Sequence, residues 1–309
     1  MKNLRFCLIV GSFIGTLCAQ EESAPAAPAE PAATEEGRWS DFLPINKEMA
    51  GDADLPLPFG IGVTVYGQEQ DMNVNSIKLK NIDISGLIPG APLYDTTATA
   101  TNVASDIDNK SVRLDAWVLP FLNVYGVLGT VDGKSTVSGV SMDKSPWGTL
   151  AAIMAGHQAV LDPLAVGIEA NGFPFDYEGD VYGAGVVLAG EMDKFWGTLD
   201  INFTRAKLDG SISEIDTVTV SPRIGINVEA GGMMGSLWIG GMHQDVEENQ
   251  IGSTVMGGIP VNWDVLLEQK NEWNFLVGGS IELDEQADFA IEAGFGDREQ
   301  LMGSITIRF

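Results

Sequence analysis

Cysteine is absent from the chain after position 18. The two that exist, Cys7 and Cys18, stand near its beginning, so the residues after them can form neither a disulfide framework nor a reactive thiol. Histidine is nearly as scarce, because His157 and His243 are the sole examples and lie in separate regions. The Gly-x-Ser-x-Gly nucleophile motif, the His-Glu-x-x-His zinc motif and the Walker phosphate loop are missing. These absences predict a protein that is not an enzyme and needs no cofactor or metal.

Basic residues are also in short supply. The 309 residues include 17 Lys and Arg against 43 Asp and Glu, which gives a formal net charge of −26. A field of that sign repels nucleic acid, so a basic-patch nucleic-acid binder is excluded. The same field attracts positive charge, and small cationic or polar solutes are the partners that the composition favours.

Long apolar runs are missing except at the beginning of the chain. Lys2 and Arg5 give a positive segment, and an apolar run follows from Phe6 to Leu17. This run is shorter than the about 20 residues that a membrane-spanning helix needs. A cleavage site after Ala19 completes the pattern of a secretion signal. Residues 1–19 are therefore predicted to be a signal peptide that is removed on export.

This first segment has two other interpretations. An uncleaved membrane anchor is the alternative that stays open. A lipoprotein signal is disfavoured, because it carries a small residue directly before its cysteine and here the bulky Leu17 precedes Cys18.

Residues 20–58 have no apolar periodicity. The part from 20 to 37 is rich in Ala, Pro and Glu, and such a composition cannot bury enough surface to offset the entropy of the chain. The part from 38 to 58 is mixed, with Pro44, Pro56 and Pro58. We predict a disordered leader followed by a pre-barrel segment that threads into the next domain or lies beneath it.

From Phe59 onward, apolar and polar residues alternate in segments of roughly ten. The clearest segment is 195–203, in which Phe195, Leu199, Ile201 and Phe203 share one face. The same alternation recurs at 217–228, 273–283 and 287–295, and in weaker form at 59–66, 112–118, 121–131, 181–190 and 235–246. Alternation with period two is the pattern of strands with one apolar face.

A soluble β-sandwich also alternates, so further features decide between the two folds. Several apolar faces carry aromatic residues near their ends, as at Phe195, Trp273 and Phe295, where a membrane barrel places its interfacial girdles. Short connections recur between the segments, as at Asp284-Glu285-Gln286. The fold class predicted for residues 59–309 is therefore all-β, an antiparallel transmembrane β-barrel.

The end of the chain and several internal stretches resemble bacterial outer-membrane β-barrel proteins of uncharacterised function. The last nine residues alternate and place Ile305, Ile307 and Phe309 on one face, similar to the C-terminal signal that the barrel-assembly machinery recognises. LDAWVLPFLNVYGVLG, FWGTLDINFT and WNFLVGGSIEL carry the resemblance between about Leu55 and Phe309. It implies location in the bacterial outer membrane, with outer-membrane lipid and the assembly machinery as partners, and it implies no activity.

Two strand counts follow from this fold. With both termini on the periplasmic side, counting back from Phe309 gives ten strands. Long outer connections then fall near 68–108, 132–177, 208–215 and 247–271. A hairpin at Asp132-Gly133 with a returning strand near 163–170 would give twelve, which is the preferred count. Residues 148–161 could instead form a short helix that caps or plugs the lumen.

A set of polar residues is predicted to line the lumen, because Arg facing lipid at mid-membrane would cost roughly 2–4 kcal/mol and acidic residues somewhat less. The set comprises Arg113, Asp115, Asp200, Asn202, Arg223, Asn227, Asn274, Glu282, Asp288 and Glu292. Acidic residues outnumber arginines in it. A water-filled lumen of this kind would favour cations, whereas in a closed barrel the same residues would pair with each other.

The leading functional hypothesis is a passive channel or solute transporter with a polar, acid-rich lumen. The alternative is a closed structural or surface-interaction barrel that acts through its long outer loops. An outer-membrane lipid hydrolase is a distant third, since His243 shares a face with Leu237 and Ile239 and fits an interfacial position better than a general base. The acidic clusters Asp106-x-Asp108 and Asp245-x-Glu247-Glu248 could bind calcium, but a solvated acidic surface explains them more simply.

Overall fold

The computed structural model describes residues 43–50, 55–145, 156–209, 213–256 and 258–309. The chain separates into two units, Met1–Arg38 and Trp39–Phe309, and every element below belongs to the second. The predicted signal peptide, the leader and residues 148–155 of the predicted helix lie outside the described residues.

One antiparallel sheet accounts for nearly all of the described chain. Its strands are β1 (Phe59–Ile82), β2 (Tyr94–Thr99), β3 (Asn102–Leu119), β4 (Leu122–Ser138), β5 (Ser141–Met142), β6 (Phe173–Met192), β7 (Phe195–Leu208), β8 (Glu214–Ala230), β9 (Met233–Met256), β10 (Ile259–Gln269), β11 (Trp273–Glu282), β12 (Ala287–Phe295) and β13 (Arg298–Arg308). The helices are the short 3-10 helix η2 (Lys47–Ala50) and α2 (Gln158–Asn171). Among the described residues, no helix is both long and apolar enough to cross a membrane.

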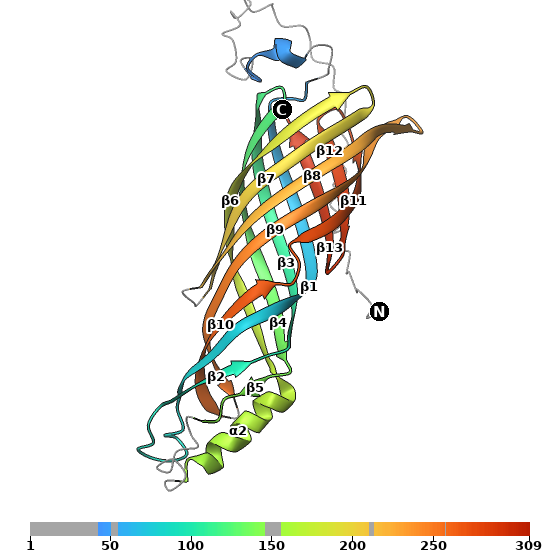
Figure 1. Ribbon diagram of the computed structural model, residues 1–309. Helices are drawn as coiled ribbons and strands as arrows, with labels where there is room; N and C mark the ends of the chain where they lie inside the picture. The colour runs from blue at the N-terminus through green and yellow to red at the C-terminus, as the bar shows by residue number, and fades with distance from the viewer. Residues whose placement is uncertain (1–42, 51–54, 146–155, 210–212, 257) are drawn as a thin grey trace, which may run out of the picture. The chain divides into compact units, whose positions relative to one another are not determined.

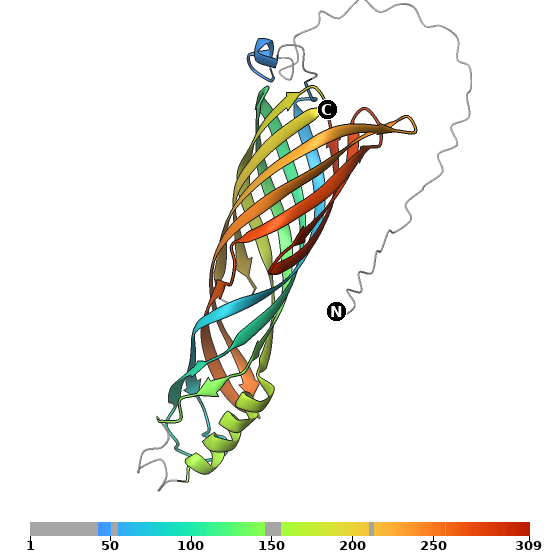
Figure 2. The same ribbon diagram turned by 45° about the vertical axis from the view of Figure 1, so that its right-hand side comes forward.

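Ten of these strands close into a ring. The ring runs β1-β3-β4-β6-β7-β8-β9-β11-β12-β13, and β13 pairs back onto β1 from Gly60 opposite Arg308 to Gln70 opposite Arg298. Figures 1 and 2 show the tilted strands, with the C-terminus at one end of the barrel and α2 at the other. The predicted antiparallel barrel is confirmed, and its ring has ten strands in place of the preferred twelve.

The two features that would have raised the count to twelve form different structures. Asp132 and Gly133 lie inside the continuous strand β4, where no turn occurs. Residues 163–170 belong to α2 and not to a returning strand. The additional strands β2, β5 and β10 lie outside the ring of ten. β2 pairs with the far end of β1, β10 pairs with the far ends of β1 and β9, and β5 pairs with β2.

An apolar belt covers the outside of the ring. Each of the ten ring strands contributes at least one large apolar side chain that is more than a third exposed, for example Val63 on β1, Leu128 on β4, Ile224 on β8 and Ile305 on β13. The residues between them point inward and are mostly polar or glycine. Apolar outside and polar inside is the reverse of a soluble protein, and it is the arrangement of a transmembrane β-barrel.

Beyond the belt, the apolar residues of the same strands face inward and the polar residues face outward. In β1, Val63 and Val65 face outward near the start of the strand, whereas Lys78 and Lys80 face outward near its end. The inward residues of β1 are glycine or polar near its start and apolar near its end. We call this part the outer extension: it comprises β2, β5, β10, α2 and the adjoining ends of β1, β3, β4, β6, β7, β8 and β9.

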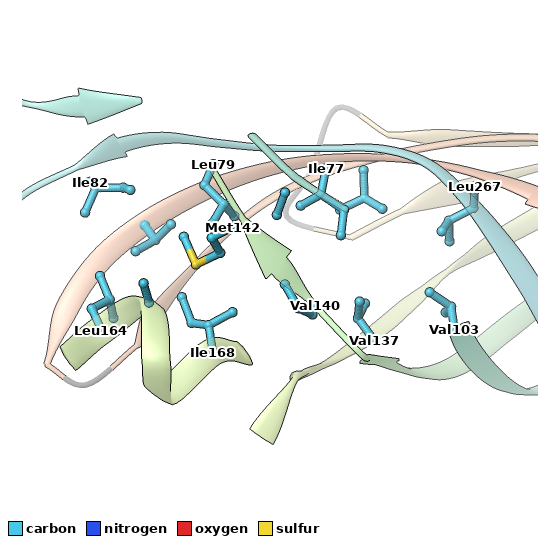
Figure 3. Close-up of a cluster of buried hydrophobic side chains, with 14 of the residues drawn as sticks. Ile77, Leu79, Ile82, Val103, Val137, Val140, Met142, Leu164, Ile168 and Leu267 are labelled. Atoms are coloured by element: carbon cyan, nitrogen blue, oxygen red, sulfur yellow. The ribbon is translucent and has the colours of Figure 1, made fainter. Parts of the chain in front are cut away.

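The interior of the outer extension is a packed apolar core. This outer core includes Met72, Ile77, Leu79, Ile82, Val103, Val137, Val140, Met142, Leu161, Leu164, Ile168, Val261, Val265 and Leu267, each no more than 8% exposed. Figure 3 shows Leu164 and Ile168 of α2 directed toward Met142 and Val140. Much of the chain expected to form long outer loops is therefore strand, extended because it has an apolar core to enclose.

Candidate functional site: the interior of the barrel

Within the belt, a bidentate ion pair crosses the lumen. Arg223 on β8 donates from Nε to Glu292 Oε2 at 2.6 Å and from Nη2 to Oε1 at 2.8 Å, and Glu292 lies on β12. Trp238 Nε1 on β9 donates a third hydrogen bond to Glu292 Oε2 at 2.7 Å. The Glu292 side chain has no exposed surface and that of Arg223 is 16% exposed. A buried charge pair needs this degree of hydrogen bonding to offset its lost hydration.

A second network fills the lumen beside β3 and β4. Asn123 connects two charged groups, because its Nδ2 donates to Asp115 Oδ1 at 2.6 Å and its Oδ1 accepts from Arg113 Nη2 at 3.0 Å. Arg308 also donates to Asp115 Oδ1, at 3.2 Å. The guanidinium of Arg113 lies 3.7 Å from the ring centroid of Tyr125. These contacts connect β3, β4 and β13 across the interior.

Asp200 joins the same network from β7. Tyr125 donates its hydroxyl to Asp200 Oδ1 at 2.6 Å, and Arg113 Nη1 is 3.9 Å from Asp200 Oδ2. Asn202 Nδ2 is 3.4 Å from Asp200 Oδ1. Carboxylates and guanidinium groups in this part of the lumen are thus engaged with each other.

One mouth of the barrel opens into a vestibule, a cavity of about 980 Å³. Its acidic lining comes from the ends of β6, β11 and β12, with Glu191, Glu282 and Asp288, and from the connection that contains Asp284 and Glu285. The pre-barrel segment also contributes, through Met49 and residues 55–57. Backbone hydrogen bonds attach that segment to β3, from Ile45 N to Val118 O and from Trp117 N to Pro58 O, each at 2.8 Å.

Toward the outer extension, a cluster of amides surrounds one arginine. We call it the Arg298 cluster: Arg298, Gln300, Asn274, Gln244, Gln269 and Tyr66. Arg298 Nη1 donates to Gln244 Oε1 at 2.6 Å and its Nε donates to Gln300 Oε1 at 3.2 Å. Gln300 Oε1 also accepts from Asn274 Nδ2 at 3.1 Å and from the Tyr66 hydroxyl at 3.3 Å.

The residues proposed from the sequence to line the lumen all lie on inward faces, but in three separate groups. Arg113, Asp115, Asp200, Asn202, Arg223 and Glu292 form the two networks within the belt. Asn227, Glu282 and Asp288 line the vestibule. Asn274 belongs to the Arg298 cluster.

Several interior residues were missed by the sequence analysis. Arg308 and Arg298 are the important ones, because both are cations in an interior that was predicted to be acid-rich. The signal was available: alternation along β13 places every even-numbered residue from 298 to 308 on the face of Arg308. Tyr125 and Asn123 could have been found in the same way from the weaker alternation at 121–131.

Helix α2 covers the end of the outer core and is fastened by polar contacts. Glu169 accepts a hydrogen bond from Lys144 Nζ at 2.9 Å and one from the backbone N–H of Met142 at 3.1 Å. These two bonds hold the pKa of Glu169 below its usual range, with the Lys144 bond the larger cause. At the other end of α2, His157 Nδ1 shares a hydrogen bond with the Tyr94 hydroxyl. Of the helix considered for residues 148–161, only residues 156–161 are described, and residues 158–161 form the first turn of α2.

The other histidine lies on the outside of the barrel. His243 Nε2 is 2.7 Å from Glu272 Oε2, and its ring packs edge-on against Trp273 at 5.2 Å between centroids. Among the described residues, no group of three or more His, Cys, Asp or Glu could hold a metal ion. Asp106 and Asp108 face outward from β3, and Ile305, Ile307 and Phe309 face outward from the end of β13.

Comparison with known proteins adds distant structural likenesses only. No family model and no curated protein sequence matches the chain. The transport unit of the autotransporter AIDA-I from Escherichia coli is similar at 9% identity and a TM-score of 0.37, over 82% of this chain and 90% of that one. An outer membrane channel from Pseudomonas putida F1 gives 10% identity and a TM-score of 0.33, over 84% and 98%.

LpxR from Salmonella typhimurium is similar at 9% identity and a TM-score of 0.31, over 81% of this chain and all of that one. Likenesses at this level carry no argument about activity. The transmembrane barrel is established by the chain's own sheet and belt, and its function has to be inferred from the interior.

Proposed function

We propose that this protein is a closed β-barrel of a bacterial outer membrane that acts through its outer extension. The observation that carries the proposal is the change in the interior along the barrel axis. The lumen is polar within the belt and becomes the apolar outer core beyond it, where Ile77, Val265 and Val103 have no exposed surface. Water and ions do not cross a packed apolar interior.

The placement in the envelope is part of the same proposal. Residues 1–19 would be the cleaved signal peptide, residues 20–58 the leader and pre-barrel segment, and residues 59–309 the barrel inserted by the assembly machinery through its last strand. With short turns on the periplasmic side, the vestibule faces the periplasm and α2 faces the outside. The outer extension then presents folded strands and a helix to the surroundings, in place of mobile loops.

A passive channel with a preference for cations or polar solutes is the second candidate. The vestibule favours it, because a cavity of about 980 Å³ lined by Glu191, Glu282 and Asp288 would gather such solutes at the mouth. Passage would require both the Arg223–Glu292 pair and the outer core to move aside.

Conductance of the refolded full-length protein in a planar bilayer separates the two candidates. A heat-modifiable, folded protein that stays electrically silent under a salt gradient is the expected result. Steady cation-selective steps from the unmodified protein would refute the closed barrel and establish the channel, and neutralising Glu282 and Asp288 would then reduce the selectivity.

A further inference from the structure

Arg298 differs from the other arginines of the described chain in having no carboxylate partner. Four of the five lie within 3.8 Å of one: Arg113 and Arg308 near Asp115, Arg205 near Asp216, and Arg223 near Glu292. Arg298 is only 3% exposed, and no ion pair includes it. A guanidinium keeps its proton in proteins, so the cluster holds a buried positive charge.

Neighbouring carboxylates are already used. Glu292 accepts three hydrogen bonds, two from Arg223 and one from Trp238. Asp71 faces outward, where it pairs with Lys270 at 3.2 Å. Neither is available to balance the charge of Arg298.

Two donors of the Arg298 cluster are left without partners. Arg298 Nη2 and Gln300 Nε2 are buried and meet no acceptor among the described residues. The Gln300 amide cannot be flipped to remove the problem, since its Oε1 accepts from Arg298 Nε and Asn274 Nδ2 and a flip would leave the Arg298 Nε donor unpaired. Both donors belong to side chains that project from one face of β13. Orphan donors in a buried site call for an ion or water that satisfies them.

We propose that the Arg298 cluster binds a small monovalent anion of the halide class, held by Arg298 Nη2 and Gln300 Nε2. A halide accepts hydrogen bonds and donates none, and its single charge balances the single guanidinium. Buried charges are stable when they are paired and hydrogen-bonded. The remaining orphan atoms of the cluster are the acceptors Gln269 Oε1 and Asn274 Oδ1. As acceptors they cannot bind an anion, so the proposal assigns them water molecules that donate to them.

The anion would act as a fixed counter-ion between the polar lumen and the outer core. Without it, the network would carry an uncompensated cation directly below an apolar interior. This inference concerns the stability of the barrel, so it holds for a closed barrel and for a channel alike.

Crystals of the refolded full-length protein grown in bromide provide the direct test. An anomalous bromide peak within hydrogen-bond distance of Arg298 Nη2 is expected. The parallel measurement is the thermal unfolding midpoint in detergent at one ionic strength, in sodium chloride, sodium bromide or sodium gluconate. Halides should raise the midpoint by roughly 2–4 °C over gluconate in a saturable way, since binding to the folded state alone stabilises it.

Two variants serve as a matched pair. Arg298→Gln should abolish the difference between halide and gluconate, whereas Arg205→Gln should keep it, because Arg205 faces outward and pairs with Asp216. If Arg298→Gln does not fold, the wild-type salt series and the bromide map still decide the matter. Equal midpoints in all three salts together with water density at Arg298 Nη2 would overturn the proposal.

Discussion

The Arg223–Glu292 pair is a buried, bidentate ion pair in the lumen. Both groups are largely removed from water, and the pair joins β8 to β12, which are not neighbours in the ring. Removing one partner of a buried pair leaves an uncompensated charge and costs about 3–5 kcal/mol. Replacing both partners by apolar residues costs much less, because no charge then remains buried.

Arg223→Met is therefore expected to lower the free energy of unfolding by about 3–5 kcal/mol. The double variant Arg223→Met/Glu292→Leu should recover most of that loss, although Trp238 Nε1 then lacks its acceptor. Urea unfolding of the refolded barrel, followed by tryptophan fluorescence, measures both. A double variant as unstable as the single one would show that the stabilisation comes from shape and not from charge.

Glycines opposite aromatic rings explain one misleading feature of the sequence. Asp132-Gly133 has the composition of a hairpin turn, yet Gly133 lies in the middle of β4. A Cβ at Gly133 would come within 2.1 Å of the Tyr177 ring, so glycine is needed there for space and not for a turn. The same relation holds between Gly225 and Trp196 and between Gly278 and Trp238. Nothing in the local sequence separates these two uses of glycine.

At the scale of single elements, α2 depends on Glu169 for its attachment beside β5. The folded protein lowers the pKa of Glu169, chiefly through the hydrogen bond from Lys144 and then through the backbone N–H of Met142. A carboxyl group with a depressed folded pKa stabilises the folded form above its unfolded pKa. That contribution is lost as the pH falls from the ordinary glutamate value of about 4.3 through the lower folded value.

We expect hydrogen exchange in α2 to become faster as the pH is lowered below about 4.3, after correction for intrinsic exchange rates. Glu169→Gln supplies the control, since it retains the shape of the side chain without the titration. The variant should match the wild type at low pH and show weaker protection of α2 at pH 7. Equal protection of the two proteins at pH 7 would mean that the apolar contacts of Leu164 and Ile168 alone hold the helix.

The sequence predicted the belt strands well and the outer extension poorly, for a physical reason. Alternation at 195–203 and 273–283 predicts strands correctly, because the apolar residues face lipid along the whole segment. In the second half of β1, Ile77 and Leu79 still alternate with Lys78 and Lys80, but the apolar residues now face inward. If a strand is recognised only by apolar residues on its lipid-facing side, it is predicted to end where the apolar residues move to the inward side. For this reason the sequence predicts loops where the structure has long strands.

The sequence is enough to predict which residues face the interior, but not which of them contact each other. Strand phase alone places Asp115, Arg223 and Glu292 on inward faces. Which of them meet depends on the number of strands and their tilt, because contacts such as Arg223 with Glu292 span the lumen between residues 69 positions apart. With twelve strands in place of ten, the ring would be wider and the same residues would have different partners.

At the scale of the whole molecule, we propose that the barrel is closed at two places along its axis. The Arg223–Glu292 pair crosses the lumen within the belt, and the outer core fills the extension beyond it. The two closures use opposite physics, since the first is a charged network and the second is an apolar interior that excludes water. Weakening one should therefore leave the other intact, and an open path requires both to fail.

This arrangement predicts that conductance appears only in a combined variant. Ile77 and Val265 are direct partners across β1 and β10 and have no exposed surface, so Ile77→Asp/Val265→Asp places two repelling carboxylates in the outer core and draws water into it. In planar bilayers this double variant should stay silent, and so should Arg223→Ser/Glu292→Ser.

The four substitutions together should give steady, cation-selective steps. Lys78→Asn/Asp264→Asn is the matched control, because these outward neighbours on the same two strands are also cross-strand partners. Adding that pair to Arg223→Ser/Glu292→Ser should leave the barrel silent. Conductance from the Arg223→Ser/Glu292→Ser variant alone would show that the outer core does not seal the barrel, and the closed-barrel function would fall with it.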